Sequence, residues 1–195
     1  MPIHPDCIEK TAHPKATVFC LGILTSSGSP TGQPRGAAAA VLLFKGAVWG
    51  ATVICLGESI TKFNSQLAAF QLALTLTSLF LRNENYRGEI LILNNIKATV
   101  LKITDTKPGL DQPLILDAAW SIDHILLKST NCSLRFVWGK RVDTQVAYKQ
   151  AKKLALNTIK DPFDPNCKLY TINYQHAQAK SEATCQWEEH WHMDP

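Results

Sequence analysis

The sequence lacks several features that would assign it to a protein class at once. It contains no run of about 20 apolar residues, so we expect no membrane-spanning helix. Its first residues contain no apolar run either, so we expect no secretory signal and an intracellular protein, nuclear or cytoplasmic. Internal repeats and low-complexity tracts are also absent. What is present is a globular composition, 46% apolar and 18% charged, in a chain of 195 residues that is long enough for one domain with additional segments.

The cysteine spacing favours neither a disulfide framework nor a structural zinc site. The six cysteines are scattered singly, no C-x-x-C occurs, and several lie in apolar segments, which is typical of buried free thiols. A zinc site would have to use Cys185, His190 and His192, whose spacing is not a recognised ligand pattern. We therefore favour solvated tail residues for these three.

Charge is distributed unevenly along the chain. Residues 1–160 carry 18 Lys and Arg against 10 Asp and Glu, a balance of +8, whereas residues 161–195 carry 2 against 6, a balance of −4. A basic body with an acidic tail suits a protein that binds polyanions, although an ordinary solvated surface produces the same numbers.

Hydrophobic periodicity and turn residues predict an alternating α/β chain. We expect an irregular arm over residues 1–15, a domain over 16–160, and an acidic tail over 161–195 that folds back on the domain. Within the domain the pattern predicts strands at 16–24, 36–44, 47–57, 88–94 and 133–138, and helices at 61–83, 95–104, 113–129 and 142–159. A tight turn at Lys45 and Gly46 joins the second and third strands, so the first three strands form an antiparallel meander. In the helix over 113–129 we expect the packing face to consist of Ile115, Ala118, Ala119, Ile122, Leu126 and Leu127.

The stretch from Glu89 to Val100, "EILILNNIKATV", poses a specific question, because an apolar strand runs into two consecutive asparagines. The strand has the composition of one buried on both faces, and the carboxyl end of such a strand is where binding and catalytic groups usually lie. The simpler interpretation is that Asn94 or Asn95 caps the helix that follows.

Four segments in this order resemble ribonuclease H domains, in the version carried by non-LTR retrotransposons, and the resemblance covers roughly residues 16–159. They are "TVFCLGIL" with "TGQPRGAAAAVLLF", "FNSQLAAFQLAL", "ILILNNIKATV" and "RFVWGKRVDTQVAYKQAKKLA". The resemblance implies a ribonuclease H-like fold: a five-stranded mixed sheet, three antiparallel strands and then two parallel ones, flanked by helices. It also implies a site in which four carboxylates hold two divalent cations and hydrolyse the RNA strand of an RNA–DNA hybrid.

The acids do not carry over to this chain. The first-strand aspartate falls on Leu21, with Thr25 as a less favoured register, the central-helix glutamate on Gln66, the fourth-strand aspartate on Asn94, and the last aspartate on Tyr148. The histidine of the closing loop falls on Lys140. Neutral amides are poor ligands for hard cations, leucine cannot coordinate, and a tyrosine phenol is neutral at pH 7. The sequence therefore predicts a pseudoenzyme with no metal and no cofactor, in which Glu58 is the one other acid expected near the site.

A site without its carboxylates no longer repels phosphates, so nucleic-acid binding without cleavage is the function we expect first. The predicted contacts are listed together: Arg35, Asn64, Lys97, Lys140, Arg141, Lys149, Lys152 and Lys153. The alternative for the lysines is the solvated face of an amphipathic helix.

Two other functions remain open from the sequence. One is a protein-interaction scaffold that uses the tail, where Trp187 and Trp191 could anchor a partner, or an exposed sheet edge. The other is a residual metal-dependent ribonuclease acting on RNA–DNA hybrids.

Overall fold

A computed structural model describes residues 15–25, 34–58, 60–103, 112–129, 131–139 and 146–159. The predicted arm and tail, including Trp187 and Trp191, therefore lie outside the described residues. The element order is β1 (Ala16–Thr25), β2 (Arg35–Phe44), β3 (Ala47–Glu58), α1 (Lys62–Glu84), β4 (Gly88–Asn94), α2 (Lys97–Ile103), α3 (Gln112–Lys128), β5 (Cys132–Trp138) and α4 (Val146–Thr158). No helix in these ranges is long and apolar enough to cross a membrane.

The five strands form one mixed sheet in the order β3-β2-β1-β4-β5. β1 pairs antiparallel with β2, and β2 with β3, whereas β4 runs parallel to both β1 and β5. The meander is closed by the predicted turn, in which Lys45 (φ 52°) and Gly46 (φ 78°) both adopt the left-handed conformation that a two-residue hairpin requires. The predicted mixed sheet, with its antiparallel meander and two parallel strands, is confirmed.

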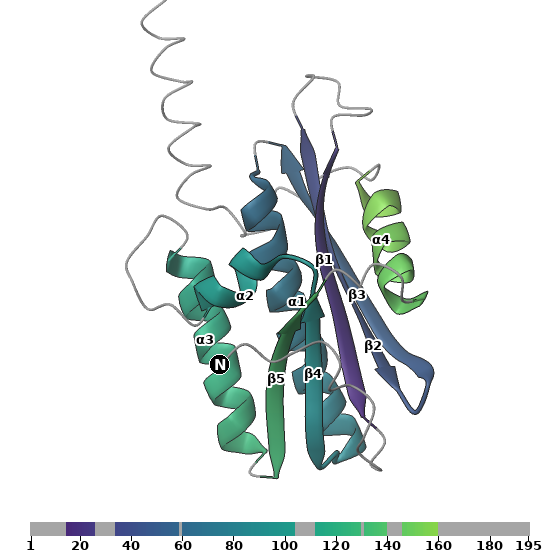
Figure 1. The fold of residues 1–195 in the computed structure, drawn as a ribbon, viewed down its shortest axis with the longest axis vertical. Helices are drawn as coiled ribbons and strands as arrows, with labels where there is room; N and C mark the ends of the chain where they lie inside the picture. The colour runs from purple at the N-terminus through teal and green to yellow at the C-terminus, as the bar shows by residue number, and fades with distance from the viewer. Residues whose placement is uncertain are drawn as a thin grey trace, which may run out of the picture.

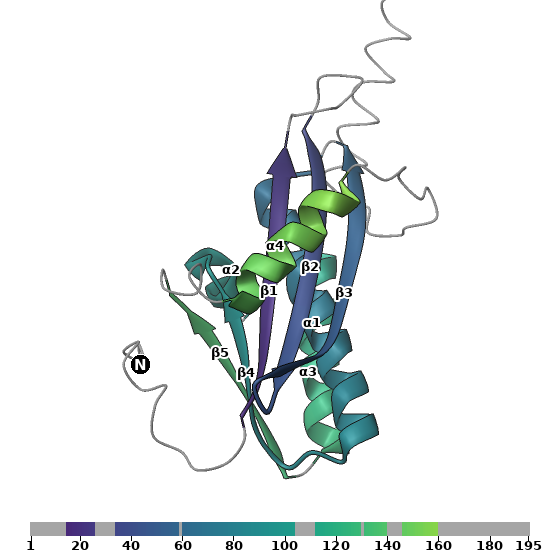
Figure 2. The ribbon, with the colours of Figure 1, turned by 90° about the vertical axis from the view of Figure 1, so that its right-hand side faces the viewer.

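Helices cover both faces of the sheet and divide the core into two clusters. Figures 1 and 2 show α1, α2 and α3 on one face and α4 alone on the other. The alanine run of β2 serves both faces: Ala38 and Ala40 belong to the cluster under α1, and Ala37 and Ala39 to the cluster under α4. All four are 0% exposed, and their small side chains let a helix lie close on either side of the strand.

The central helix is seated by a tight contact with β1. The side chain of Thr61 caps α1 by accepting a hydrogen bond from the backbone N–H of Asn64 at 3.1 Å. A Cβ on Gly22 would lie 2.1 Å from the carbonyl carbon of Ser65 and 2.5 Å from the backbone nitrogen of Gln66. Glycine is therefore required at position 22 because the first turn of α1 occupies the space of a side chain.

Two sequence predictions differ from the observed helices. α2 begins at Lys97 instead of residue 95. The side-chain oxygen of Asn94 accepts a hydrogen bond from the backbone N–H of Ile96, with 2.7 Å between oxygen and nitrogen, and this bond holds the chain in a turn before the helix. The predicted start of the last helix at residue 142 falls among residues 140–145, which lie outside the described residues, and α4 is described from Val146 onward. The predicted packing face of α3 was wrong at its carboxyl end: Ile125 is buried, whereas Leu126 and Leu127 are 40% and 80% exposed.

Candidate functional site

The candidate site lies where β4 ends beside the middle of β1. Phe19 of β1 is level with Leu93 of β4, so Cys20 lies next to Asn94, and β1 continues beyond that point. α1 crosses the same region with its first two turns, which carry Gln66. Parallel strands and the start of a helix thus bring together residues that are far apart in the sequence.

Two buried amides are joined at this position by direct hydrogen bonds. Nδ2 of Asn94 donates to Oε1 of Gln66 at 3.0 Å, and Nε2 of Gln66 donates to the backbone oxygen of Gly22 at 2.5 Å. The same Asn94 nitrogen also lies 3.4 Å from the backbone oxygen of Cys20. Asn94 is 0% exposed and Gln66 is 1% exposed. We call Gln66, Asn94 and Cys20 the amide cluster.

Both side-chain oxygens of the amide cluster are engaged inside the protein. Oε1 of Gln66 accepts from Asn94, and Oδ1 of Asn94 accepts the N–H of Ile96. The second bond closes a turn at Ile96, ahead of α2, so Asn94 satisfies a backbone N–H just before the helix, whereas the prediction was a cap on the helix itself. Each oxygen keeps a second lone pair, but a neutral amide oxygen is a weak ligand for a hard divalent cation and supplies no negative charge. The residues present do not fit a pair of divalent cations.

Cys20 completes the amide cluster and was not among the predicted site residues. Its thiol lies 3.5 Å from Nδ2 of Asn94 and 3.5 Å from the backbone oxygen of Leu93. Burial raises the pKa of Cys20 to about 12, although the hydrogen bond from Asn94 lowers it in part, so the thiol stays neutral at pH 7. Strand alternation could have found this residue, because Cys20 and Gly22 share the face of β1 that meets α1.

Leu21 and Tyr148, the other two degenerate positions, lie together on the opposite face of the sheet. Both belong to the buried cluster beneath α4, at 4% and 5% exposure. Asn95 links the two faces, because its Nδ2 donates to the hydroxyl oxygen of Tyr148 at 2.6 Å. The four predicted positions therefore converge on the end of β4, but from the two sides of the sheet.

The acids that could substitute for the missing carboxylates are remote. The strand register places Glu58 level with Arg35 and Thr25, four residues beyond Leu21 and two strands across, which is about 15 Å away. The prediction that Glu58 lies near the site is wrong, because this separation is beyond the reach of a glutamate side chain. Asp117 and Asp123 are exposed on α3, as expected. Within the described part of the chain, no three of His, Cys, Asp or Glu are grouped so that they could hold a metal ion.

The predicted nucleic-acid contacts fall into three groups. Lys149, Lys152 and Lys153 are exposed on α4, and Lys97 is exposed at the start of α2, where its amine lies 4.8 Å from the ring centroid of Trp138. Arg35 is partly buried, with its guanidinium 3.8 Å from the sulfur of Cys55. Lys140 and Arg141 lie outside the described residues.

Asn64 is a correction to the predicted contacts. It is 1% exposed, inside the first turn of α1, where the helix packs on β1. Its side chain is therefore enclosed by the fold and is not presented to a ligand.

Comparison with solved structures identifies this architecture as the ribonuclease H-like fold. The chain is similar to ribonuclease H1 from the halophilic archaeon Halobacterium salinarum, with a TM-score of 0.51, 15% identity, and coverage of 76% of this chain and 99% of that one. It is similar to LC11 ribonuclease H1 in complex with an RNA/DNA hybrid, with a TM-score of 0.52, 15% identity, and coverage of 74% and 96%. It is also similar to a foamy viral protease–reverse transcriptase in complex with an RNA/DNA hybrid, with a TM-score of 0.56, 15% identity, and coverage of 82% of this chain and 22% of that one.

Sequence comparisons add no relative to these structures. No protein-family model matches the chain, and no curated protein matches it. At about 15% identity the structural matches establish the fold alone.

Proposed function

We propose that this chain is a catalytically inactive ribonuclease H-like module that binds nucleic acid without cleaving it. The observation that carries the proposal is the amide cluster, in which the side-chain oxygens of Gln66 and Asn94 both accept internal hydrogen bonds and the thiol of Cys20 keeps its proton. Two-metal hydrolysis requires clustered negative charge to hold both cations against their mutual repulsion. A neutral, buried and internally satisfied cluster does not supply it.

We infer that the chain descends from the ribonuclease H domains of non-LTR retrotransposons. The support is the order and spacing of the four resembling segments. In all four of them an uncharged residue, Leu21, Gln66, Asn94 or Tyr148, occupies the position of a carboxylate. Glutamine and asparagine keep the size of the acids they replace, which suits a fold retained after catalysis was lost.

Binding to a nucleic-acid backbone is supported by the cations near the same end of the sheet. Lys149, Lys152 and Lys153 project from the exposed side of α4, and Lys97 lies beside the exposed Trp138. Two proteins with this fold, LC11 ribonuclease H1 and the foamy viral reverse transcriptase, were solved bound to RNA/DNA hybrids. Cationic contacts to phosphates give affinity without sequence preference, so we expect hybrid, duplex and single strands all to bind.

The binding claim is tested with a labelled RNA–DNA hybrid by fluorescence anisotropy in buffer containing a metal chelator. We expect binding that needs no magnesium, and we expect Lys149→Gln with Lys153→Gln to reduce the slope of log K against log salt by about two. The charge-matched control is Lys15→Gln with Lys45→Gln, because the pairing of Ala16 with Phe44 places both lysines at the other end of the β1–β2 pair. Equal slopes in the two double variants, or no binding at low salt, would overturn the claim.

The inactivity claim is tested by a cleavage assay on the same hybrid with magnesium and with manganese. We expect no product from the unaltered protein with either metal. Cleavage that disappears in Gln66→Leu or Asn94→Leu would show that the amide cluster takes part in catalysis and would overturn the proposal. The matching gain-of-function arm is the double variant Gln66→Glu, Asn94→Asp, which restores two of the four carboxylates.

A further inference from the structure

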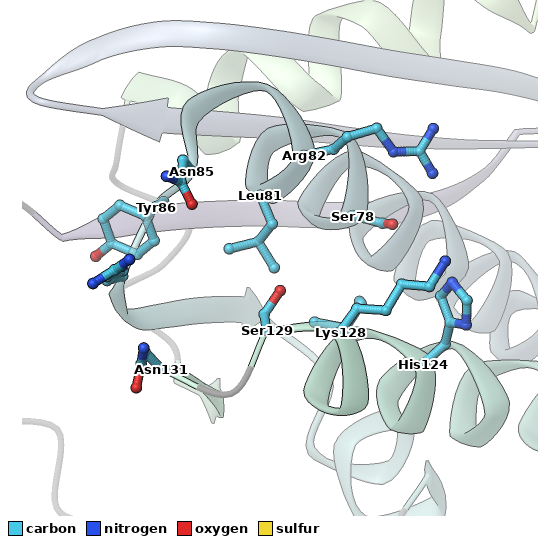
Figure 3. A pocket seen from close by; sticks show the side chains of 11 residues that line it. Ser78, Leu81, Arg82, Asn85, Tyr86, His124, Lys128, Ser129 and Asn131 are labelled. Carbon is cyan, nitrogen blue, oxygen red and sulfur yellow. The ribbon is translucent and has the colours of Figure 1, made fainter.

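A second polar site lies at the opposite end of α1 from the amide cluster. A pocket of about 360 Å³ opens between the last turns of α1 and α3 and the residues that precede β4 and β5. Gln66 and Arg82 are 16 residues apart on α1, so the pocket is about 24 Å from the amide cluster along the helix. Figure 3 shows Lys128 and His124 of α3 across the pocket from Ser78 and Arg82 of α1.

The pocket lining is cationic and contains no carboxylate. It includes the cations of Arg82, Arg87 and Lys128, together with His124 and the hydrogen-bonding groups of Ser78, Asn85, Ser129 and Asn131. The two acids nearest to Arg82 and Arg87 along the chain have other partners, and Asp123, next to His124, is exposed and not part of the lining. Glu84 accepts a hydrogen bond from the indole of Trp49 at 2.7 Å, and Glu89 pairs with Arg135 at 2.7 Å. In these contacts neither Glu84 nor Glu89 is paired with a cation of the pocket.

The general preference of helix C-termini for cationic residues explains only part of this lining. Arg82 and Lys128 lie in the last turns of α1 and α3, where a cation is favoured in any helix. That effect does not require the two helix ends to face one pocket. It also does not account for Arg87, which lies beyond α1 in the connection to β4. The convergence of cations from three segments on a concave surface suits an anion such as a phosphate.

The groove continues from this pocket to an exposed aromatic side chain. An adjoining hollow of about 570 Å³ shares Ser78, Arg82, His124 and Ile125 with the pocket and extends to Leu79, Asp117 and Trp120. Trp120 is 80% exposed, on a helix where Leu127 is equally exposed. The cations gather in the pocket, whereas Trp120 lies in the adjoining hollow, which also contains the carboxylate of Asp117. An exposed aromatic ring next to a cluster of cations is an arrangement that proteins use to stack a base while binding its phosphate.

The pocket and the adjoining hollow together form what we call the α1–α3 groove. We propose that this groove binds a nucleotide unit, with its phosphate at Arg82, Arg87 and Lys128 and its base stacked on Trp120. The unit could belong to a single strand of nucleic acid or to a free nucleotide, since both present the same phosphate and base. The groove is separate from the lysines of α4 that the proposed function uses, and it faces the opposite side of the sheet. Either proposal can therefore fail without the other.

The test uses the full chain and two probes in a metal-free, low-salt buffer. The first probe is a fluorescein-labelled oligothymidine of about 12 nucleotides, within the usual site size for single-strand binding. The second is a mononucleotide, thymidine monophosphate, titrated against the unlabelled protein and followed by isothermal titration calorimetry, with inorganic phosphate as a reference ligand.

Each substitution in the groove is paired with the same kind of substitution elsewhere, so that loss of a groove contact can be distinguished from a general loss of positive charge or of exposed apolar surface. We expect Lys128→Gln to weaken binding of the tighter probe about three- to tenfold, whereas Lys62→Gln, the same change in the first turn of α1, leaves the affinity within twofold. We expect Trp120→Ala to weaken binding about tenfold through lost stacking, whereas Leu127→Ala, an equally exposed side chain of α3 outside the groove lining, does not. All four side chains are exposed, so circular dichroism should report an unchanged fold.

The outcomes decide both the site and the source of its ligand. If the mononucleotide binds and the oligothymidine binds no tighter per site, the ligand is a free nucleotide. If the oligothymidine binds at least tenfold tighter and loses affinity with salt, the ligand is a strand. If inorganic phosphate binds as tightly as the mononucleotide, if neither nucleotide probe binds, or if each variant matches its control, the proposal is wrong.

Discussion

The strictest test of the amide cluster is to restore one negative charge at the position of the central-helix glutamate. Gln66→Glu keeps the size of the side chain but replaces the Nε2 donor, which lies 2.5 Å from the backbone oxygen of Gly22, by an oxygen. An ionised carboxylate would then face a carbonyl oxygen in a position that is 1% exposed. Asn94 could still donate to the other oxygen, so one favourable contact would survive.

The magnitude follows from the pKa shift that this environment imposes. Burial and the facing carbonyl both raise the pKa of the new carboxyl group, and buried glutamates reach a pKa of about 8 to 9. Because the folded-state pKa is raised, the unfolded chain loses its proton first as pH increases, so folding stability falls from about pH 4.3 upward. At pH 7 this amounts to about 2.7 pH units at about 1.4 kcal/mol each, or about 4 kcal/mol. Near pH 4 the protonated side chain can still donate to Gly22, so the loss should be below about 1 kcal/mol.

Urea denaturation followed by circular dichroism at several pH values between 4 and 7 measures this effect. The control is Gln150→Glu, the same chemical change in a partly exposed position of α4, for which we expect a change of less than about 0.5 kcal/mol at every pH. If Gln66→Glu costs no more than the control at pH 7, or if its cost does not change with pH, the cluster tolerates a carboxylate and the argument against a metal site fails.

Three further predictions concern the surroundings of the cluster. Because the pKa of Cys20 is raised to about 12, its contribution to stability is complete below pH 9 and is lost above it, so Cys20→Ala should flatten the fall in unfolding free energy measured between pH 9 and 10.5. Gly22→Ala should destabilise by about 3 kcal/mol or more in thermal denaturation, whereas Gly139→Ala, where an added Cβ meets nothing within 4 Å, should cost less than about 1 kcal/mol. Tyr148→Phe should cost about 1 kcal/mol in urea denaturation through the lost hydrogen bond from Asn95, and an unchanged midpoint would contradict that bond.

The elements of the fold were accessible from the sequence because each is specified locally. Short apolar runs bounded by turn residues define the strands, Lys45 and Gly46 define the hairpin, and the long Leu- and Ala-rich run defines the central helix. The resemblance then supplied the mixed character of the sheet, and the pairing order, with β1 between β2 and β4, came only from the structure. Spacing could not fix how much of α3 is buried, because that depends on where α1 and the sheet end beneath it, and Leu127 was misplaced for this reason.

The sequence predicted only part of the candidate site. Motif matching located Gln66 and Asn94, but it pointed to the residue before Gly22 and so selected Leu21, which faces α4, in place of Cys20. A motif records the order of residues along a strand and not the face on which each side chain emerges. No sequence motif indicated the α1–α3 groove, because its cations come from separate segments and converge only when α1 and α3 pack together.

The sequence alone thus determined that the four positions of the resemblance carry no negative charge, since charge belongs to the side chain and needs no neighbour. Only the tertiary structure decided what the amides do. Asn94 and Gln66 are 28 residues apart, and whether their oxygens face outward toward a ligand or inward toward each other depends on how α1 sits against β1 and β4. That packing turns both oxygens inward, because a buried amide is stable when its hydrogen bonds are satisfied within the fold.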